Sequence, residues 1–140
     1  MGQCGPNTFS YLLGLLDLTR ADGAQLRDIV VEHVKDPAVQ ARKTNCAKPG
    51  GGCYTLGELI VKCMADWPSE SRGDAKPSVK GWCSVIARRE SWTDLALIQA
   101  VADRFAVAIS LICVNDLSDI WDAGVILPCN GRNPVGLVRA

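Results

Sequence analysis

The sequence predicts an α+β fold in which helices pack on a small central β-sheet. Apolar residues recur at helical spacing in several segments of the first two thirds of the chain. Residues 106–116, "AVAISLICVND", then form a continuous apolar run that is rich in β-branched side chains and has no helical spacing, which is typical of a strand buried on both faces. Two shorter apolar segments, 122–129 and 133–140, follow and predict two more strands. Helices followed by strands are typical of an α+β layer architecture.

Length and charge restrict the classes of protein to which this chain can belong. Its 140 residues and 48% hydrophobic content fit one domain over 1–140, and no repeat or linker divides it. Fifteen basic residues balance fifteen acidic ones, so neither a nucleic-acid partner nor a membrane surface is expected. The longest apolar runs are also too short to span a bilayer.

The cysteines favour a reducing compartment. There are seven of them, and an odd number argues against a secreted disulfide framework, so we expect an intracellular, cytoplasmic location. No pair has the short spacing of a structural zinc site, and we therefore expect neither a metal nor a cofactor. Three of the seven lie in apolar stretches and are predicted to act as small core residues: Cys63, Cys83 and Cys113.

The first half of the chain predicts three helices and a loop. Residues 7–18 have apolar side chains at helical spacing, with Asn7 as the expected N-cap. Residues 24–36 form an amphipathic pattern that carries the only histidine, His33, as a surface or boundary residue. Residues 36–53, with "PGGG", are predicted to be a loop.

The next segments predict helices bounded by clear caps. Residues 54–67 contain Thr55 and Glu58 at the spacing of a capping box. A polar loop, a short helix and a strongly patterned helix then lead into the long strand. These segments are 68–78, 79–91 and 92–105, the last with Thr93 as its expected N-cap.

Cys4 stands just before the first helix, and this position has a chemical consequence. The thiolate, not the thiol, is the nucleophile, and the free N–H groups and dipole of a helix N-terminus lower the pKa of a nearby thiol. Small residues beside it, Gly2 and Gly5, would let backbone N–H groups approach a substrate carbonyl. A cysteine without a visible base is weak evidence when taken alone.

The order of these elements resembles the ovarian-tumour (OTU) family of cysteine proteases, which are mostly deubiquitinases. "GQC" at 2–4 resembles the Gly-x-Cys part of the family's Asp-Gly-x-Cys turn, and "FSYLLGLL" resembles the helix that follows it. "LRDIVVEHV" is similar to the family's next helix. "GWCSVIARRESWTDLALIQAVADRF", with Trp92, and then "VAISLICV" resemble its later helices, tryptophan and strand.

This resemblance implies a papain-like architecture and a thiol hydrolase that cleaves the (iso)peptide bond after the C-terminal Gly-Gly of ubiquitin or a ubiquitin-like protein. Cys4 would be the nucleophile, and the backbone of Gly2, Gln3 and Cys4 would form the oxyanion hole. Ubiquitin or a ubiquitin-like protein would be the partner. The loops 40–53 and 68–78 are the expected places for substrate contacts.

The family's catalytic histidine has no counterpart at the expected place, because no histidine follows His33. Two explanations remain open. In one, Asn133 occupies the histidine position, with Pro134 in place of the aromatic residue, and the domain is a pseudo-protease that binds ubiquitin or another protein without turnover. In the other, 133–140 is the strand that precedes the missing pair, and the chain as given stops before its base; Met1, in place of the family's Asp, fits this second explanation.

Overall fold

A computed structural model describes residues 4–68, 76–88, 94–114, 120–129 and 133–139. It confirms a mixed fold of helices and small sheets, as expected of the α+β class. The elements in chain order are α1 (Cys4–Leu15), α2 (Gly23–Val34), α3 (Pro37–Gln40), β1 (Lys43–Ala47), β2 (Cys53–Thr55), α4 (Leu56–Ala65), α6 (Val79–Ile86), α7 (Leu95–Phe105), β3 (Val107–Val114), β4 (Ile120–Ile126) and β5 (Gly136–Arg139).

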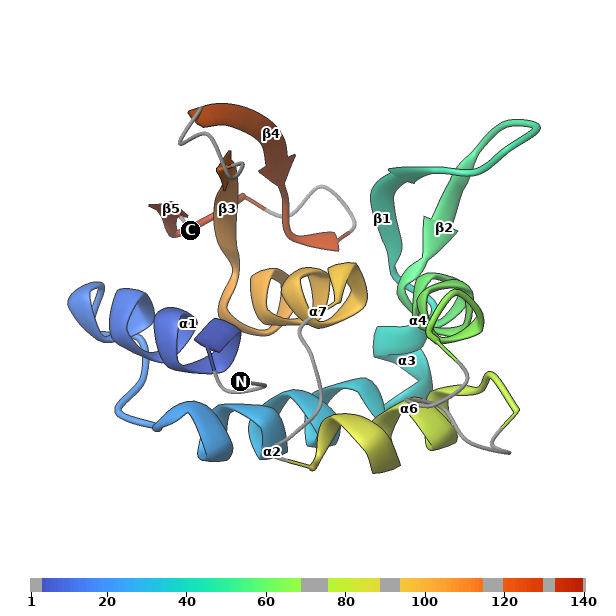
Figure 1. Cartoon of the computed structure of the whole chain (residues 1–140), viewed down its shortest axis with the longest axis horizontal. Coiled ribbons are helices and arrows are strands. Elements are labelled where there is room, and N and C mark those ends of the chain that lie inside the picture. The colour runs from blue at the N-terminus through green and yellow to red at the C-terminus, as the bar shows by residue number, and fades with distance from the viewer. Residues whose placement is uncertain (1–3, 69–75, 89–93, 115–119, 130–132, 140) are drawn as a thin grey trace.

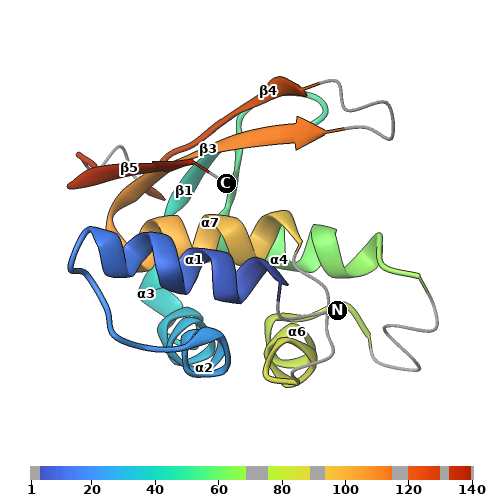
Figure 2. The ribbon, with the colours of Figure 1, turned by 60° about the vertical axis from the view of Figure 1, so that its left-hand side comes forward.

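The elements form three layers (Figures 1 and 2). The sheet of β3, β4 and β5 lies on one side, α1, α7 and α4 form the middle layer, and α2 and α6 lie side by side on the far side. Because the middle helices are covered on both sides, their apolar residues supply much of the core. Fully buried side chains from this layer include Leu13, Leu56, Ile60, Met64, Ala100 and Ala102.

The three-stranded sheet has β3 at its centre, in the order β4-β3-β5. β4 pairs antiparallel with β3, and β5 pairs parallel with it, with Val107 opposite Gly136 and Ser110 opposite Arg139. The predicted central strand is confirmed, since residues 107–110 are buried. The two shorter predicted strands are confirmed as β4 and β5.

Capping explains most helix starts. Thr55 and Glu58 form the predicted capping box of α4, and Asp22 and Gln25 form a second box at α2. The expected cap of the last helix was wrong, because Asp94 caps α7 by accepting from the Leu97 N–H, whereas Thr93 lies outside the described residues. Asp94 can do this because its extended backbone aims the carboxylate at the first turn.

The expected start of the first helix was also wrong. Helix α1 begins at Cys4 rather than after Asn7, so Asn7 is a helical residue and not the cap. Pro6 does not prevent this, since a proline in the first turn lacks only an N–H that would have no partner within the helix. The helix therefore extends to the cysteine itself.

The predicted loop 36–53 contains structure. Asp36 caps the short helix α3, and β1 pairs antiparallel with β2, with Lys43 opposite Thr55. The turn of this hairpin uses Gly50, Gly51 and Gly52, all with positive φ, which is a conformation that glycine adopts without steric cost. The Thr44 hydroxyl donates to the Tyr54 carbonyl at 2.8 Å and ties the two strands together.

Candidate functional site

Cys4 is the first residue of helix α1. The first turn of α1 carries no acidic side chain, so the positive end of the helix dipole is not neutralised from within the helix. This is the backbone setting that favours a thiolate at that position. The side chain of Cys4 and the whole of Gly2 and Gln3 lie outside the part of the chain that the structure describes.

Strand β5 lies beside α1, and the first residue of β5 lies near the C-terminal end of α1. A Cβ on Gly136, the first residue of β5, would lie 2.8 Å from Leu16 Cδ1, which follows α1 directly. The Val135 N–H donates to the Ala106 carbonyl at 2.6 Å and fixes this entry point. In Figure 2, β5 runs from there back over α1, toward the N-terminal end of that helix.

The rise per residue of a helix and of a strand tells how far a strand must extend to run the length of α1. A helix rises about 1.5 Å per residue, so Leu16 and Cys4 are separated by about 18 Å along α1. A strand rises about 3.3 Å per residue, so a strand continuing β5 would draw level with Cys4 about five or six residues after Gly136.

Asn133 lies near the C-terminal end of α1, away from Cys4. It comes three residues before Gly136, and Gly136 contacts the residue that follows α1. The structure therefore places Asn133 near the C-terminal end of α1, whereas Cys4 starts that helix, and does not bring the two together. Asn133 and Pro134 are both exposed.

His33 lies near the end of α2, and its ring has a partner other than Cys4. Gly23, at the start of α2, packs against Asn7, where a Cβ would lie 3.0 Å from the Asn7 backbone nitrogen. His33 comes ten residues later, about 15 Å further along α2. Its ring is directed at Asp103 of α7, so it is not placed as a base for a thiol at the start of α1.

The structure reveals a polar cluster that the sequence did not predict. His33 Nε2 and Arg42 Nη1 both donate to Asp103 Oδ2, each at 2.6 Å. The side chain of Asp103 is completely buried, and those of His33 and Arg42 are 13% and 27% exposed. The cluster joins α2, α7 and the segment that leads into β1.

Electrostatics keep Asp103 ionised in this setting. Burial by itself raises the pKa of the carboxyl, but the hydrogen bond from His33 and the charge of Arg42 outweigh it, and the pKa lies below its usual value. A buried carboxylate with two donors of this kind is stabilised in place rather than available for proton transfer.

Two thiols border this cluster through Gln99, which lies one turn before Asp103 on α7. The Gln99 amide Nε2 donates to the Leu127 carbonyl at 2.7 Å and contacts Cys129 Sγ at 3.6 Å, and Cys46 Sγ contacts Gln99 Oε1 at 4.0 Å. Burial, followed by the charge of Asp103, raises the pKa of the Cys129 thiol to about 12. Cys129 is thus protonated at neutral pH and is not a nucleophile.

The sequence did hold a signal for this cluster. Gln99 and Asp103 are four residues apart on a helix that is otherwise apolar nearly all round, so the two polar side chains had to be buried and paired. The cluster ties α7 to α2 and to the C-terminal segment, and its chemistry is structural.

The remaining cysteine predictions have mixed outcomes. Cys83 is buried, as expected of a core residue, whereas Cys63 is only partly buried. Burial and the nearby charge of Asp94 raise the pKa of Cys63 to about 11. The side chain of Cys113 lies outside the described residues, as do Trp92 and most of the predicted loop 68–78.

The described residues contain neither a candidate metal site nor a helix that could span a membrane. Among those residues, no three His, Cys, Asp or Glu side chains are grouped so that they could hold a metal ion. No described helix combines the length and the apolar character needed to cross a bilayer.

Comparison with known proteins adds no relative to this picture. No family model, no curated protein and no solved structure matches the chain.

Proposed function

We propose that the chain is an OTU-like domain of papain-like architecture that acts on ubiquitin or a ubiquitin-like protein, with Cys4 as the nucleophile of a thiol hydrolase. The observation that carries the proposal is the start of α1 at Cys4. A cysteine at this place gains thiolate character from the free N–H groups of the first turn. The resemblance of the ordered segments to the OTU family supplies the substrate class.

In the proposed reaction the Cys4 thiolate attacks the carbonyl carbon of the substrate's terminal glycine. The backbone N–H groups of Gly2, Gln3 and Cys4 would donate to the oxyanion that forms. The amine leaves with a proton from a general acid, and water then hydrolyses the thioester. The acid and base would come from a residue that follows β5, because a strand continued along α1 approaches the helix start.

A ubiquitin whose C-terminus carries an electrophile, such as propargylamide, tests this proposal. We expect a covalent adduct on Cys4, identified by peptide mass spectrometry, in a chain extended beyond Ala140. Cys4→Ser should abolish the adduct, whereas Cys53→Ser, which alters a half-buried thiol of the β1–β2 hairpin, should leave it unchanged. An extended chain without any adduct at Cys4 contradicts the hydrolase.

The engagement of His33 with Asp103 favours a second candidate function. His33 is the only histidine of the chain, and its ring is hydrogen-bonded to Asp103. The chain as given would then be an inactive OTU-like domain that binds ubiquitin without turnover. An NMR titration of ¹⁵N-labelled ubiquitin with the 140-residue chain tests this: saturable shifts that persist with Cys4→Ser support it, and no shifts at millimolar concentration contradict it.

A further inference from the structure

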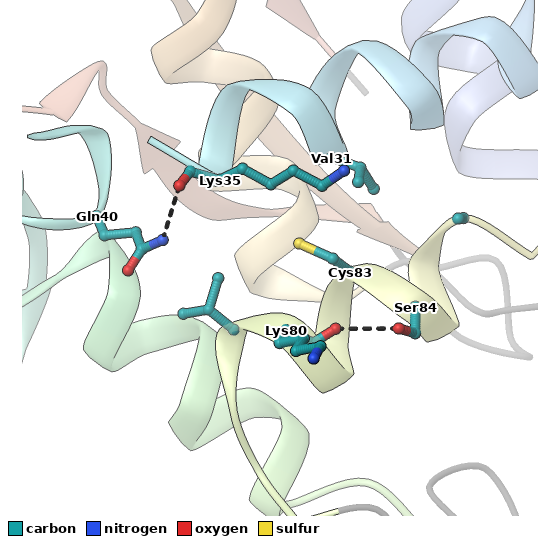
Figure 3. A pocket seen from close by; sticks show the side chains of 8 residues that line it. Val31, Lys35, Gln40, Lys80, Cys83 and Ser84 are labelled. Atoms are coloured by element: carbon teal, nitrogen blue, oxygen red, sulfur yellow. Dashed lines mark hydrogen bonds between the residues drawn. The ribbon is translucent and has the colours of Figure 1, made fainter. Parts of the chain in front are cut away.

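A cleft lies between α2 and α6 (Figure 3). These two helices form the layer on the side of the molecule opposite to the sheet (Figure 1). Its volume is about 550 Å³, within the range of small-molecule sites. It takes no part in the proposed hydrolase site, which lies at the start of α1. We call it the α2–α6 cleft, and it is lined by Val31, Lys35, Gln40, Val79, Lys80, Cys83, Ser84 and Ala87.

The floor of the α2–α6 cleft is apolar. Val31 of α2 and Cys83 of α6 are both buried, and Figure 3 shows the Cys83 sulfur pointing from α6 toward α2. Val79 and Ala87 extend this apolar surface along α6, since residues four apart lie on one face of a helix. Ser84 adds little polarity, because its hydroxyl donates to the Lys80 carbonyl at 3.1 Å.

The charged side chains of the lining are both cationic. Lys35 stands on the α2 side and Lys80 on the α6 side, and among the described residues no acidic side chain belongs to the lining. The carbon stem of Lys35 lies along α2, and its ammonium group contacts Glu32 Oε1 at 2.9 Å. This hydrogen bond raises the pKa of Lys35, so its charge is retained. Glu32 thus stands beside the cleft as a carboxylate already bound to one of its lysines.

We propose that the α2–α6 cleft binds a small anionic amphiphile, a molecule with one carboxylate head and an alkyl body. The head would lie between Lys35 and Lys80, replacing or sharing the contact that Glu32 makes. The alkyl body would lie on Val31, Cys83 and Val79. The combination of an apolar floor with two lysines favours this ligand class over neutral and cationic amphiphiles.

Decanoate, kept below its micelle-forming concentration, is a suitable probe for an NMR titration of the ¹⁵N-labelled chain. We expect saturable amide shifts confined to the lining of the cleft. Decyltrimethylammonium has the same alkyl length and the opposite charge, and should bind at least about tenfold more weakly, since ion pairs of this kind set specificity. Equal shifts with the two amphiphiles, or shifts spread over the surface, overturn the proposal.

Three variants test the individual contacts, and two of them have a matched control. Lys80→Gln should weaken decanoate binding about three- to tenfold, whereas Lys62→Gln on α4 should not change it. Glu32→Gln should strengthen binding, because it removes the competing carboxylate. Ala87→Phe fills the cleft from an exposed position and should abolish binding, with Ala65→Phe, exposed at the end of α4, as control. The spectra report whether each variant is folded, and undiminished binding to folded Ala87→Phe refutes the site.

Discussion

His33 and Asp103 are joined by a 2.6 Å hydrogen bond, although they stand on different helices and seventy positions apart in the chain. Arg42, which precedes β1, donates to the same carboxylate oxygen. One buried oxygen therefore holds α2, α7 and the start of the hairpin in fixed relation.

Removing the carboxylate charge at this point should destabilise the protein. Asp103→Asn leaves His33 and Arg42 facing a neutral amide, and we expect a loss of about 2–4 kcal/mol in the free energy of unfolding. Asp66→Asn, which breaks the exposed pair with Lys62, should change that free energy by less than about 0.5 kcal/mol. Urea unfolding followed by circular dichroism measures both. A small effect of Asp103→Asn would show that the buried contact contributes little.

The same carboxylate should make stability depend on acidity. Its pKa is lower in the folded state than in the unfolded one, so its stabilisation is present above the unfolded pKa of about 3.9 and is lost as the pH falls through the folded value. The free energy of unfolding should thus fall more steeply below about pH 4 in the original protein than in Asp103→Asn. If the free energy of unfolding falls equally steeply with pH in the two proteins below about pH 4, this assignment is contradicted.

Asp94 joins a helix cap to two indoles, that of the buried Trp82 and that of the partly buried Trp67. Its Oδ1 accepts from the Leu97 N–H, and its Oδ2 accepts from the Nε1–H of Trp67 and of Trp82, each at 3.0 Å. Asp94→Ala should cost about 2–4 kcal/mol, since the cap and both indole acceptors are lost. Asp94→Ser retains the cap but is too short to reach the indoles, so it should be intermediate in thermal unfolding. Equal losses in the two variants would assign the whole effect to the indoles.

Two glycines in helices should respond oppositely to alanine. A Cβ at Gly23 would collide with the side chain of Asn7 and lie 3.0 Å from its backbone nitrogen, so Gly23→Ala should destabilise the α1–α2 contact by about 1–3 kcal/mol. The nearest atom to a Cβ at Gly14 is 3.8 Å away, and Gly14→Ala should stabilise α1 by up to about 1 kcal/mol. Thermal denaturation of the two variants gives the signs, and a stabilising Gly23→Ala would refute the close packing.

The thiols should differ strongly in their rate of alkylation. The pKa values of about 12 for Cys129 and about 11 for Cys63 leave few thiolates at pH 8. Iodoacetamide should therefore modify both at least about tenfold more slowly than Cys53, which is partly exposed on the hairpin. Peptide mass spectrometry over time measures the rates. If the start of α1 activates its thiol, Cys4 should react fastest and should keep this lead at pH 6.

The sequence predicted the elements that periodicity or caps define on their own. The capping box at Thr55 and Glu58 and the apolar run that became β3 are local signals that the tertiary structure did not override. The hairpin was missed because β1 has only one buried residue, Thr44, and β2 has none, so no alternation was visible. The start of α1 was misplaced because Asn7, a residue type that often caps helices, stands just before the apolar periodicity, whereas the helix begins three residues earlier at Cys4.

The candidate sites were less accessible to prediction, because they depend on contacts between distant segments. The sequence pointed to Cys4 through its position and through the resemblance to the OTU family, but neither signal could place Asn133 near the opposite end of α1. Similarly, His33 was expected to be a surface or boundary residue, and only the packing of α2 on α7 shows that its ring meets a buried carboxylate.

The contact of Gly136 with Leu16 has a consequence for how the protein is made. Gly136 is added to the growing chain about 6–24 s after Leu16 at the usual rates of synthesis. Through that interval the nascent chain carries an unfinished sheet and an uncovered side of its first helix. A stop codon or ribosomal stall ahead of the final strand should accordingly yield a product that binds chaperones and is degraded, even though every helix has already been translated.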